Sequence, residues 1–299
     1  MNNIKNEFSI KDLENLSGIK AHTIRIWEKR YNLFEPNRTE TNIRSYSLES
    51  LQKLLNIAHL YNDGMKISKI AQLAPDEFNR LLNEKPKTAS NNDHYINTFK
   101  IAALNFDKIL FLETFNLLEK ENSFSEIFFN IFIPLITEIG FLWQTNTISP
   151  AQEHFISELI KQKILINTEK HQTTQPKNTN TLYVLFLPDN EVHELGLQFI
   201  NYKLLEAKNQ TIYLGPSVPL SSLKSLEKHY KNITYISYFT VKPEIDKINK
   251  YLEDFHNTLL KHNSNKLWVL GRLLKNTNKD KASKAITMLN SIDELVKKL

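Results

Sequence analysis

The segment PDNEVHELGLQF, residues 188–199, places Glu191, His193 and Gly196 directly after an apolar run. A neutral imidazole can ligate a transition metal through one ring nitrogen, while a nearby carboxylate accepts the other N–H and fixes the tautomer. Gly196 would let a bulky planar ligand approach the backbone. One His beside one Glu is common by chance, so these residues alone are better interpreted as a histidine at a helix cap.

A second group of such residues lies in WQTNTISPAQEH, residues 143–154, where a short polar break interrupts an apolar region. The indole of Trp143 offers a flat surface for dispersion contacts, and Glu153 with His154 could orient a bound molecule. The alternative is structural: Trp143 belongs to the core, and Glu153 and His154 open a helix after Pro150.

Basic and polar donors cluster in a third segment, IKAHTIRIWEKRYN, residues 19–32. Two short helices joined by a turn at Gly18 are typical of a helix-turn-helix, whose second helix enters the DNA major groove. Donors suited to bases and phosphates are His22, Thr23, Arg25, Lys29 and Arg30, with Arg38, Arg44 and Tyr46 in the following loop. The alternative is a solvated basic face.

The elements that must position these residues form three segments. Helical periodicity predicts helices over 8–18, 19–32 and 48–64, a small hairpin over 33–47 and a last short helix before Pro75. Residues 76–93 are predicted as a linker, and 94–171 as a four-helix bundle with breaks near Asp107, Asn122–Ser123 and 145–150. A second linker, 172–181, precedes the last segment.

Residues 182–299 alternate short β-branched or aromatic runs with helical stretches. The runs at 182–187, 211–215, 233–239 and 267–271 are predicted strands, a fifth lies in 285–290, and a helix closes the chain. This alternation predicts a doubly wound parallel sheet covered on both faces. The fold class is therefore multidomain α and α/β: a winged helix-turn-helix over 1–75, a bundle, and a Rossmann-like sheet domain.

Composition narrows the function classes. The chain has 299 residues, a net charge of +5 and no cysteine, which excludes disulfides, thiolate metal sites and a cysteine nucleophile. The apolar run at 127–143 carries Asn130, Pro134 and Glu138 and predicts a buried helix, not a membrane span. We therefore expect a cytoplasmic protein without a membrane partner.

Residues 8–73 resemble the winged-helix DNA-binding domain of the MerR family. The matching pieces are S-I-x-x-L, the T-I-R-x-W-E-x-R-Y recognition helix, the N-x-R-x-Y wing and the closing I-x-x-I helix. The resemblance implies double-stranded DNA as partner, with a palindromic operator, and self-association into a dimer or tetramer. It assigns Ile24 and Trp27 to the core. It implies DNA contacts by His22, Thr23, Arg25, Arg30, Arg38, Arg44 and Tyr46.

The third segment is similar to cobalamin-binding domains, whose motif is Asp-x-His-x-x-Gly followed by Ser-x-Leu and Gly-Gly at later strand ends. The resemblance implies cobalamin as cofactor, with His193 as the lower axial ligand of cobalt and Glu191 as the supporting carboxylate. Gly196, Ser237 and Gly271 would be further cofactor contacts. The chain departs from the pattern at Tyr238–Phe239 and at Arg272. The Arg272 guanidinium either blocks the slot for the nucleotide tail or pairs with its phosphate.

The order of the segments resembles the MerR-type cobalamin photoreceptor repressors, in which a helical bundle covers the upper face of the cofactor. This implies adenosylcobalamin, with Trp143 over the adenosyl group and Glu153 and His154 at its ribose and base edges. In that family a histidine after the Trp captures cobalt following illumination. This chain has Gln144 there, so the bis-histidine state is not expected.

Two hypotheses follow. The first is a DNA-binding transcriptional regulator whose corrinoid couples to oligomerisation and operator affinity. The second keeps DNA binding but treats the C-terminal half as a cofactor-free scaffold for dimerisation or docking of a protein regulator. A cobalamin-dependent enzyme is rejected, because its catalytic barrel needs about 250 residues that this chain does not have to spare.

Overall fold

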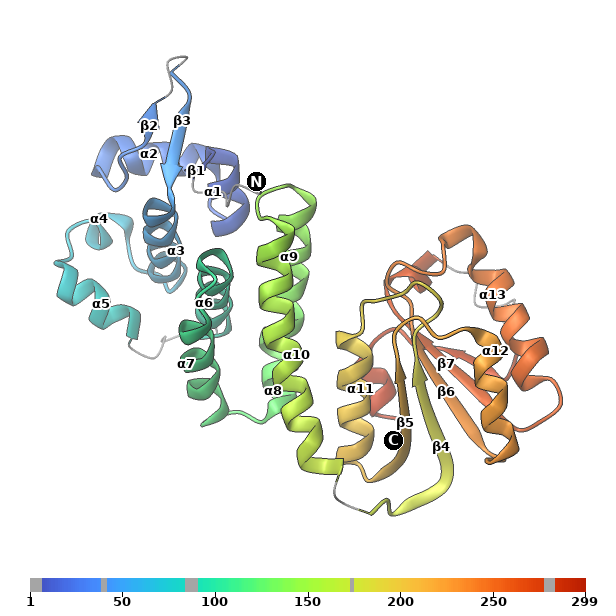
Figure 1. Cartoon of the computed structure of the whole chain (residues 1–299). Helices are drawn as coiled ribbons and strands as arrows, with labels where there is room; N and C mark the ends of the chain where they lie inside the picture. The colour runs from blue at the N-terminus through green and yellow to red at the C-terminus, as the bar shows by residue number, and fades with distance from the viewer. Residues whose placement is uncertain (1–6, 39–41, 84–90, 173–174, 277–282) are drawn as a thin grey trace. The chain divides into compact units, whose positions relative to one another are not determined.

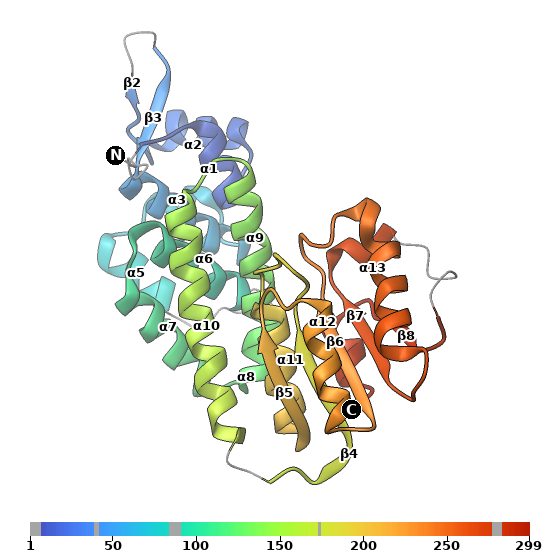
Figure 2. The same cartoon turned by 45° about the vertical axis from the view of Figure 1, so that its right-hand side comes forward.

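The computed structural model describes residues 7–38, 42–83, 91–172, 175–276 and 283–299. The chain divides into two compact units, Met1–Leu159 and Ile160–Leu299, which Figures 1 and 2 show from two sides. The predicted linker residues 84–90 and 173–174 lie outside the described residues.

The winged-helix region begins the first unit. Its elements are β1 (Glu7–Phe8), α1 (Ile10–Ser17), α2 (Ala21–Tyr31), β2 (Asn37–Arg38), β3 (Arg44–Ser47), α3 (Leu48–Asn62) and α4 (Ile67–Ile70). Ser9 and Asp12 form a capping box at the start of α1, and Gly18 ends it with φ +72°. The strands form a small antiparallel sheet in the order β1-β3-β2, which carries the predicted hairpin (Figure 1).

One prediction for this region needs correction. The structure forms a helix, α5 (Pro75–Asn83), at the start of the segment predicted as a linker. Pro75 stands at its first position, Asp76 and Glu77 lie in its first turn, and the apolar residues Phe78, Leu81 and Leu82 recur at helical spacing. The next helix begins at Asn91, so the described residues leave only 84–90 between the two helices.

The helical bundle follows the breaks expected from the sequence. Its elements are α6 (Asn91–Asn105), α7 (Lys108–Glu119), α8 (Phe124–Ile127), the π-helical turn η1 (Phe128–Phe132), α9 (Ile133–Gln144) and α10 (Pro150–Gln172). Asp107 caps α7 and Ser123 caps α8, each through its side chain. Because α8, η1 and α9 run on as one helix, the four-helix prediction is confirmed. Stacked and edge-on phenylalanines fill its centre, among them Phe99, Phe111, Phe115 and Phe132.

Within the described residues, one continuous helical run, Phe124–Gln144, has the length and apolar composition of a membrane span. Core helices of globular proteins meet the same criteria. The inner residues of this run, including Phe132, Leu135 and Ile139, are fully buried against the other bundle helices. This burial agrees with the buried helix predicted from the sequence.

Polar contacts join the winged-helix region to the bundle. The ammonium of Lys100 in α6 is buried; it donates to the Leu16 carbonyl oxygen over 3.1 Å and pairs with Glu138 of α9 at 2.7 Å. Asn15 donates to Thr147 over 3.3 Å. These contacts tie the first helix of the helix-turn-helix to the bundle, because a buried ammonium needs both a counter-charge and acceptors.

The second unit is built on a five-stranded parallel sheet in the order β5-β4-β6-β7-β8. The strands are β4 (Asn178–Phe186), β5 (Asn209–Gly215), β6 (Ile233–Tyr238), β7 (Lys266–Leu270) and β8 (Ile286–Met288). Its helices are α11 (Leu195–Glu206), α12 (Leu220–Leu223), α13 (Ile248–Phe255) and α14 (Ile292–Val296), with short η2 (Lys224–Lys228), η3 (Ile245–Lys247), η4 (His256–Leu260) and η5 (Arg272–Asn276). All five predicted strands and the closing helix are present. The second linker is shorter than predicted, because α10 includes Gln172 and β4 already begins at Asn178.

Both faces of this sheet are covered, as Figure 1 shows. Leu182, Val184 and Phe186 point to the α12–α13 face and join one apolar core with Leu252 and Phe255. The α11 helix packs on the other face, together with α14. The prediction of a doubly wound sheet is therefore confirmed, and β4 lies between β5 and β6, where the strand order reverses.

We predict that Gly271→Ala destabilises the second unit more than Gly215→Ala does. Gly271 has φ +117°, and an added Cβ would lie 2.2 Å from the Phe239 carbonyl oxygen. Gly215 has a comparable φ of +82°, but its Cβ would meet only Tyr213 Cε1 at 3.6 Å. Backbone strain of about 1–3 kcal/mol applies to both, and only Gly271→Ala adds the collision. Urea unfolding followed by circular dichroism measures the free energy of unfolding of each variant. Equal losses of this free energy in the two variants would contradict the close approach of Gly271 to the Phe239 carbonyl oxygen.

Candidate cofactor site and DNA-binding face

The carboxyl ends of β4, β6 and β7 meet at one edge of the sheet. Phe186 pairs in register with Ser237, and Tyr238 with Leu270, so the loops that follow these strands emerge side by side. Ligands of doubly wound folds bind at this edge, beside the point where the strand order reverses. Glu191 and His193 lie in the loop after β4, as predicted.

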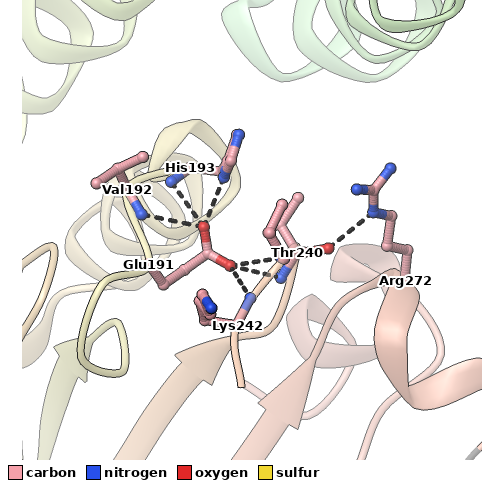
Figure 3. Close-up of polar contacts among 7 residues, drawn as sticks. Glu191, Val192, His193, Thr240, Lys242 and Arg272 are labelled. Atoms are coloured by element: carbon pink, nitrogen blue, oxygen red, sulfur yellow. Dashed lines mark hydrogen bonds and ion pairs between the residues drawn. The ribbon is translucent and has the colours of Figure 1, made fainter. Parts of the chain in front are cut away.

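Glu191 is the centre of this edge, and its carboxylate is 1% exposed. Its Oε1 accepts hydrogen bonds from the His193 ring Nδ1 at 2.6 Å and from the backbone N–H groups of Val192 and His193, both at 3.0 Å. Its Oε2 accepts from the backbone N–H groups of Thr240, Val241 and Lys242, at 3.1, 2.6 and 2.8 Å. Figure 3 shows the carboxylate joining the two loops.

These contacts keep the Glu191 carboxylate ionised. Burial by itself raises the pKa of the carboxyl group, but the hydrogen bonds from His193 and the backbone amides lower the pKa to about 2. An ionised acceptor beside Nδ1 holds the proton on that nitrogen. The lone pair of the imidazole is then on Nε2, which is the form that ligates a metal.

The His193 side chain is 54% exposed, whereas the Glu191 side chain is completely buried. Exposed apolar side chains also lie in the segments that follow β4 and β6: Val192 is 64% exposed, Val241 42% and Ile245 68%. An oriented imidazole together with exposed apolar side chains suits a large, mostly apolar ligand that presents a metal.

One further residue of the predicted set fits a ligand at this edge. The Ser237 hydroxyl, at the end of β6, is completely buried and has no hydrogen-bond partner among the described residues, so a bound acceptor or donor would satisfy it. Gly271 instead packs its backbone against the Phe239 backbone just after β7, where no side chain would fit.

The prediction for Gly196 needs correction. A Cβ at this position would lie 3.1 Å from Cε2 of Tyr238, so the aromatic ring already packs on the glycine. Gly196 accommodates Tyr238 in this conformation and does not leave open space for a planar ligand. Phe239, the other aromatic residue of this segment, is completely buried in the core between the sheet and α13.

Trp143, Glu153 and His154 belong to the helical region. Trp143 lies near the end of α9 and is 48% exposed, so it is not the core residue of the structural alternative. Glu153 and His154 lie in the first turn of α10, where His154 Nδ1 is 3.1 Å from Glu153 Oε2 and Ser157 donates to Glu153. The predicted residues therefore form two sets, one in each compact unit.

The helix α2 exposes most of the donors that were predicted to contact DNA. His22, Arg25 and Arg30 are exposed, while Ile24 and Trp27 are buried, as predicted for core positions. Arg38 is exposed in β2. These residues present a basic face of the kind that contacts phosphates and base edges.

Tyr46 is a correction to that set. Its side chain is completely buried, and its hydroxyl donates to Glu28 Oε2 over 2.8 Å. Arg44 pairs with the other oxygen of Glu28 at 3.0 Å. Burial and Glu28 both raise the pKa of Tyr46. Tyr46 therefore joins the wing to α2 from inside the region, because a side chain without exposed area cannot reach DNA.

Sequence reasoning missed the backbone donors of residues 240–242 and the buried Lys100. Backbone N–H groups are common to nearly all residues, so no sequence pattern marks them. Lys100 did leave a signal, since it is a single cation among apolar residues in TFKIAAL. A cation at such a position predicts a buried ion pair.

We predict that acid unfolding of the second unit depends on Glu191. The folded-state pKa of about 2 lies below the usual 4.5, so the ionised carboxylate contributes stability above pH 4.5 that is lost as the pH falls towards 2. Glu191→Gln should lower the free energy of unfolding at pH 7 by roughly 2–4 kcal/mol and flatten its fall between those pH values. Urea unfolding at a series of pH values measures both effects, with Glu253→Gln, at an exposed position, as control. If the unfolding free energy of Glu191→Gln fell between pH 4.5 and 2 as steeply as that of the wild type, the lowered pKa of Glu191 would be contradicted.

Comparison with known proteins agrees with these features. Residues 8–77 match the family of MerR HTH regulatory proteins, and residues 95–166, in the helical bundle, match the B12 binding domain family. A solved structure, the monomethylamine corrinoid protein of Methanosarcina barkeri, superimposes with a TM-score of 0.56 over 69% of this chain and 97% of that chain. At 13% identity this likeness shows a shared fold.

Two curated relatives extend the match along the chain. The HTH-type transcriptional repressor CarH of Myxococcus xanthus is 24% identical over 214 residues, which are 70% of each chain. The repressor CarA of the same organism is 24% identical over 218 residues, 72% of this chain and 70% of CarA. These relatives are repressors and not enzymes. The chain is thus homologous to CarH and CarA, and it is a MerR-type DNA-binding regulator with a B12-binding domain.

Proposed function

We propose that this regulator binds a corrinoid whose cobalt is ligated by Nε2 of His193, and that occupancy of the site controls binding to operator DNA. One observation supports the proposal above the others: the buried, ionised Glu191 accepts a hydrogen bond from the Nδ1–H of His193 and so orients its exposed imidazole. When bound, a corrinoid would supply a cobalt centre able to accept the lone pair of the His193 imidazole. The protein supplies the lower ligand and its orientation.

The surroundings of His193 also support a corrinoid. Val192, Val241 and Ile245 expose apolar side chains in the segments that follow β4 and β6, and a broad macrocycle that covered them would gain from the burial of apolar area. The unpartnered Ser237 hydroxyl would gain a hydrogen bond. For the upper face we propose Trp143, Glu153 and His154, whose exposed indole and polar pair suit an adenosyl group.

For operator binding we propose that α2 enters the major groove of the DNA. The residues nearest the bases would be His22, Thr23, Arg25 and Arg30. Arg38 and Arg44 would lie along the DNA backbone. Self-association into a dimer or tetramer would present several copies of α2 to a palindromic operator. A ligand that changes only the assembly then changes DNA affinity through effective concentration. As a regulator of this kind, the protein is proposed to act in the cytoplasm.

A cofactor-free scaffold is the second candidate function. The packing of Tyr238 on Gly196 favours it, because a ring fills the space that the motif glycine would otherwise leave for a ligand. In that case the second unit would serve dimerisation or docking of a protein regulator. The binding experiment below separates the two candidates.

We predict that the purified protein retains adenosylcobalamin after desalting in the dark, with a visible spectrum of the histidine-ligated form. His193→Ala should lose most of the retained corrinoid, because the lower ligand and its oriented lone pair are gone. The exposed His229→Ala serves as control and should retain as much as the wild type. A wild-type protein without corrinoid favours the scaffold, and equal retention by His193→Ala contradicts the proposed lower ligand.

We predict opposite behaviour for two residues of the winged-helix region. Arg30→Ala should weaken DNA binding and reduce the slope of log affinity against log salt by about 1, because one phosphate contact is lost. Tyr46→Phe should leave that slope unchanged and lower stability by about 1 kcal/mol, because it removes only the bond to Glu28. Fluorescence anisotropy over a salt series tests this, and a reduced slope for Tyr46→Phe would restore Tyr46 as a DNA contact.

A further inference from the structure

Arg272 lies at the same edge, at the start of η5 after β7, and it is linked to the Glu191–His193 pair. Its Nε donates to the Thr240 carbonyl oxygen over 2.7 Å, while the Thr240 N–H donates to Glu191 Oε2 over 3.1 Å. Figure 3 shows this chain from Arg272 through Thr240 and Glu191 to His193. Hydrogen bonds through Thr240 and Glu191 thus connect the arginine to the proposed cobalt ligand.

The charge of Arg272 is available to a ligand. The side chain is exposed, and among the residues that the structure describes no carboxylate pairs with it. The neighbouring cation Lys242 differs, because Glu244 neutralises it. With Nε bound to Thr240, the two terminal nitrogens of the guanidinium remain as a fork, and Figure 3 shows them directed away from Thr240 on the side of the loops where the His193 ring lies. Such a fork matches the oxygens of a phosphate.

We propose that Arg272 is a specificity-determining residue that binds the phosphodiester of a complete corrinoid. The inference rests on the proposed function, and it assigns to this site a preference among corrinoids. In a complete corrinoid the nucleotide loop hangs from the lower face of the ring, the face that His193 would ligate. When the imidazole takes the place of the nucleotide base, the phosphodiester would be left on the protein side, where the two terminal nitrogens of Arg272 could donate hydrogen bonds to two of its oxygens.

An obstructing role for Arg272 predicts the opposite result on substitution. If the guanidinium only filled a slot needed by the nucleotide, a smaller residue would strengthen binding of the complete corrinoid. If it binds the phosphate, a smaller residue weakens that binding and leaves ligands without phosphate unaffected. The sign of the effect therefore separates the two roles.

The experiment measures equilibrium binding, by visible absorbance in the dark, of three probes to the full chain: adenosylcobalamin, adenosylcobinamide phosphate and adenosylcobinamide. The second probe keeps the phosphate without the nucleotide base, and the third lacks both. The variants are Arg272→Ala and Arg272→Lys, with Lys266→Ala at the opposite end of β7 as control for a lost exposed cation. Thermal unfolding of each variant checks that the fold is kept.

Arg272→Ala should weaken binding of the two phosphate-bearing probes by about 10- to 100-fold and change the affinity for adenosylcobinamide less than about 2-fold. Arg272→Lys should fall between, because it keeps the charge and loses the fork. Lys266→Ala should match the wild type for all three probes.

Tighter binding of adenosylcobalamin by Arg272→Ala would overturn the proposal in favour of obstruction. Equal weakening of all three probes would also overturn it, because Arg272 would then act only on the loop that holds Glu191. Unchanged affinities would remove any role in binding. If neither the wild type nor any variant bound a probe, the proposed corrinoid function itself would fail. This result differs from the others, in which at least one protein binds a probe.

Discussion

A buried carboxylate needs donors for both of its oxygens, and this requirement organises the carboxyl edge of the sheet. Glu191 meets it with the ring and backbone of its own loop on one oxygen and with three successive amides after β6 on the other. Leaving such a charge unpaired would cost several kcal/mol. The two loops are therefore held together, and His193 is oriented before any ligand arrives, which lowers the ordering cost of binding.

Local signals made most of the fold predictable. Capping residues such as Ser9 and Ser123, the turn at Gly18 and the alternation of strands with helices each act over a few residues. The helix α5 was missed because its polar composition is similar to that of a linker, although its three apolar residues recur at helical spacing. Propensity and composition cannot separate these cases without the packing partner.

The candidate site was only partly predictable for a different reason. Glu191 and His193 are only two positions apart in the sequence, so their pairing could be predicted, and the structure confirms it. The backbone amides after β6, the ring of Tyr238 on Gly196 and the burial of Tyr46 involve residues far apart in sequence. Such contacts depend on strand order and packing, which a motif does not encode.

Within the first unit, polar contacts connect the winged-helix region to α9, the helix that carries Trp143. The α9 helix bears Glu138, which pairs with the buried Lys100, and Lys100 in turn holds the carbonyl of Leu16 in α1. Thr147, just beyond Trp143, accepts from Asn15 of the same helix α1. Glu138 and Thr147, which support α1, and Trp143, the proposed upper-face contact, therefore all lie in α9 or in the turn that follows it.

The central claim is that Glu191 holds the proton of His193 on Nδ1, so that the lone pair is on Nε2. Nitrogen-15 NMR of the histidine-labelled protein without corrinoid tests it directly, with His193→Ala identifying the signal. The account predicts that the neutral ring carries its proton on Nδ1. A ring protonated at Nε2, with the lone pair on Nδ1 facing Glu191, would contradict it.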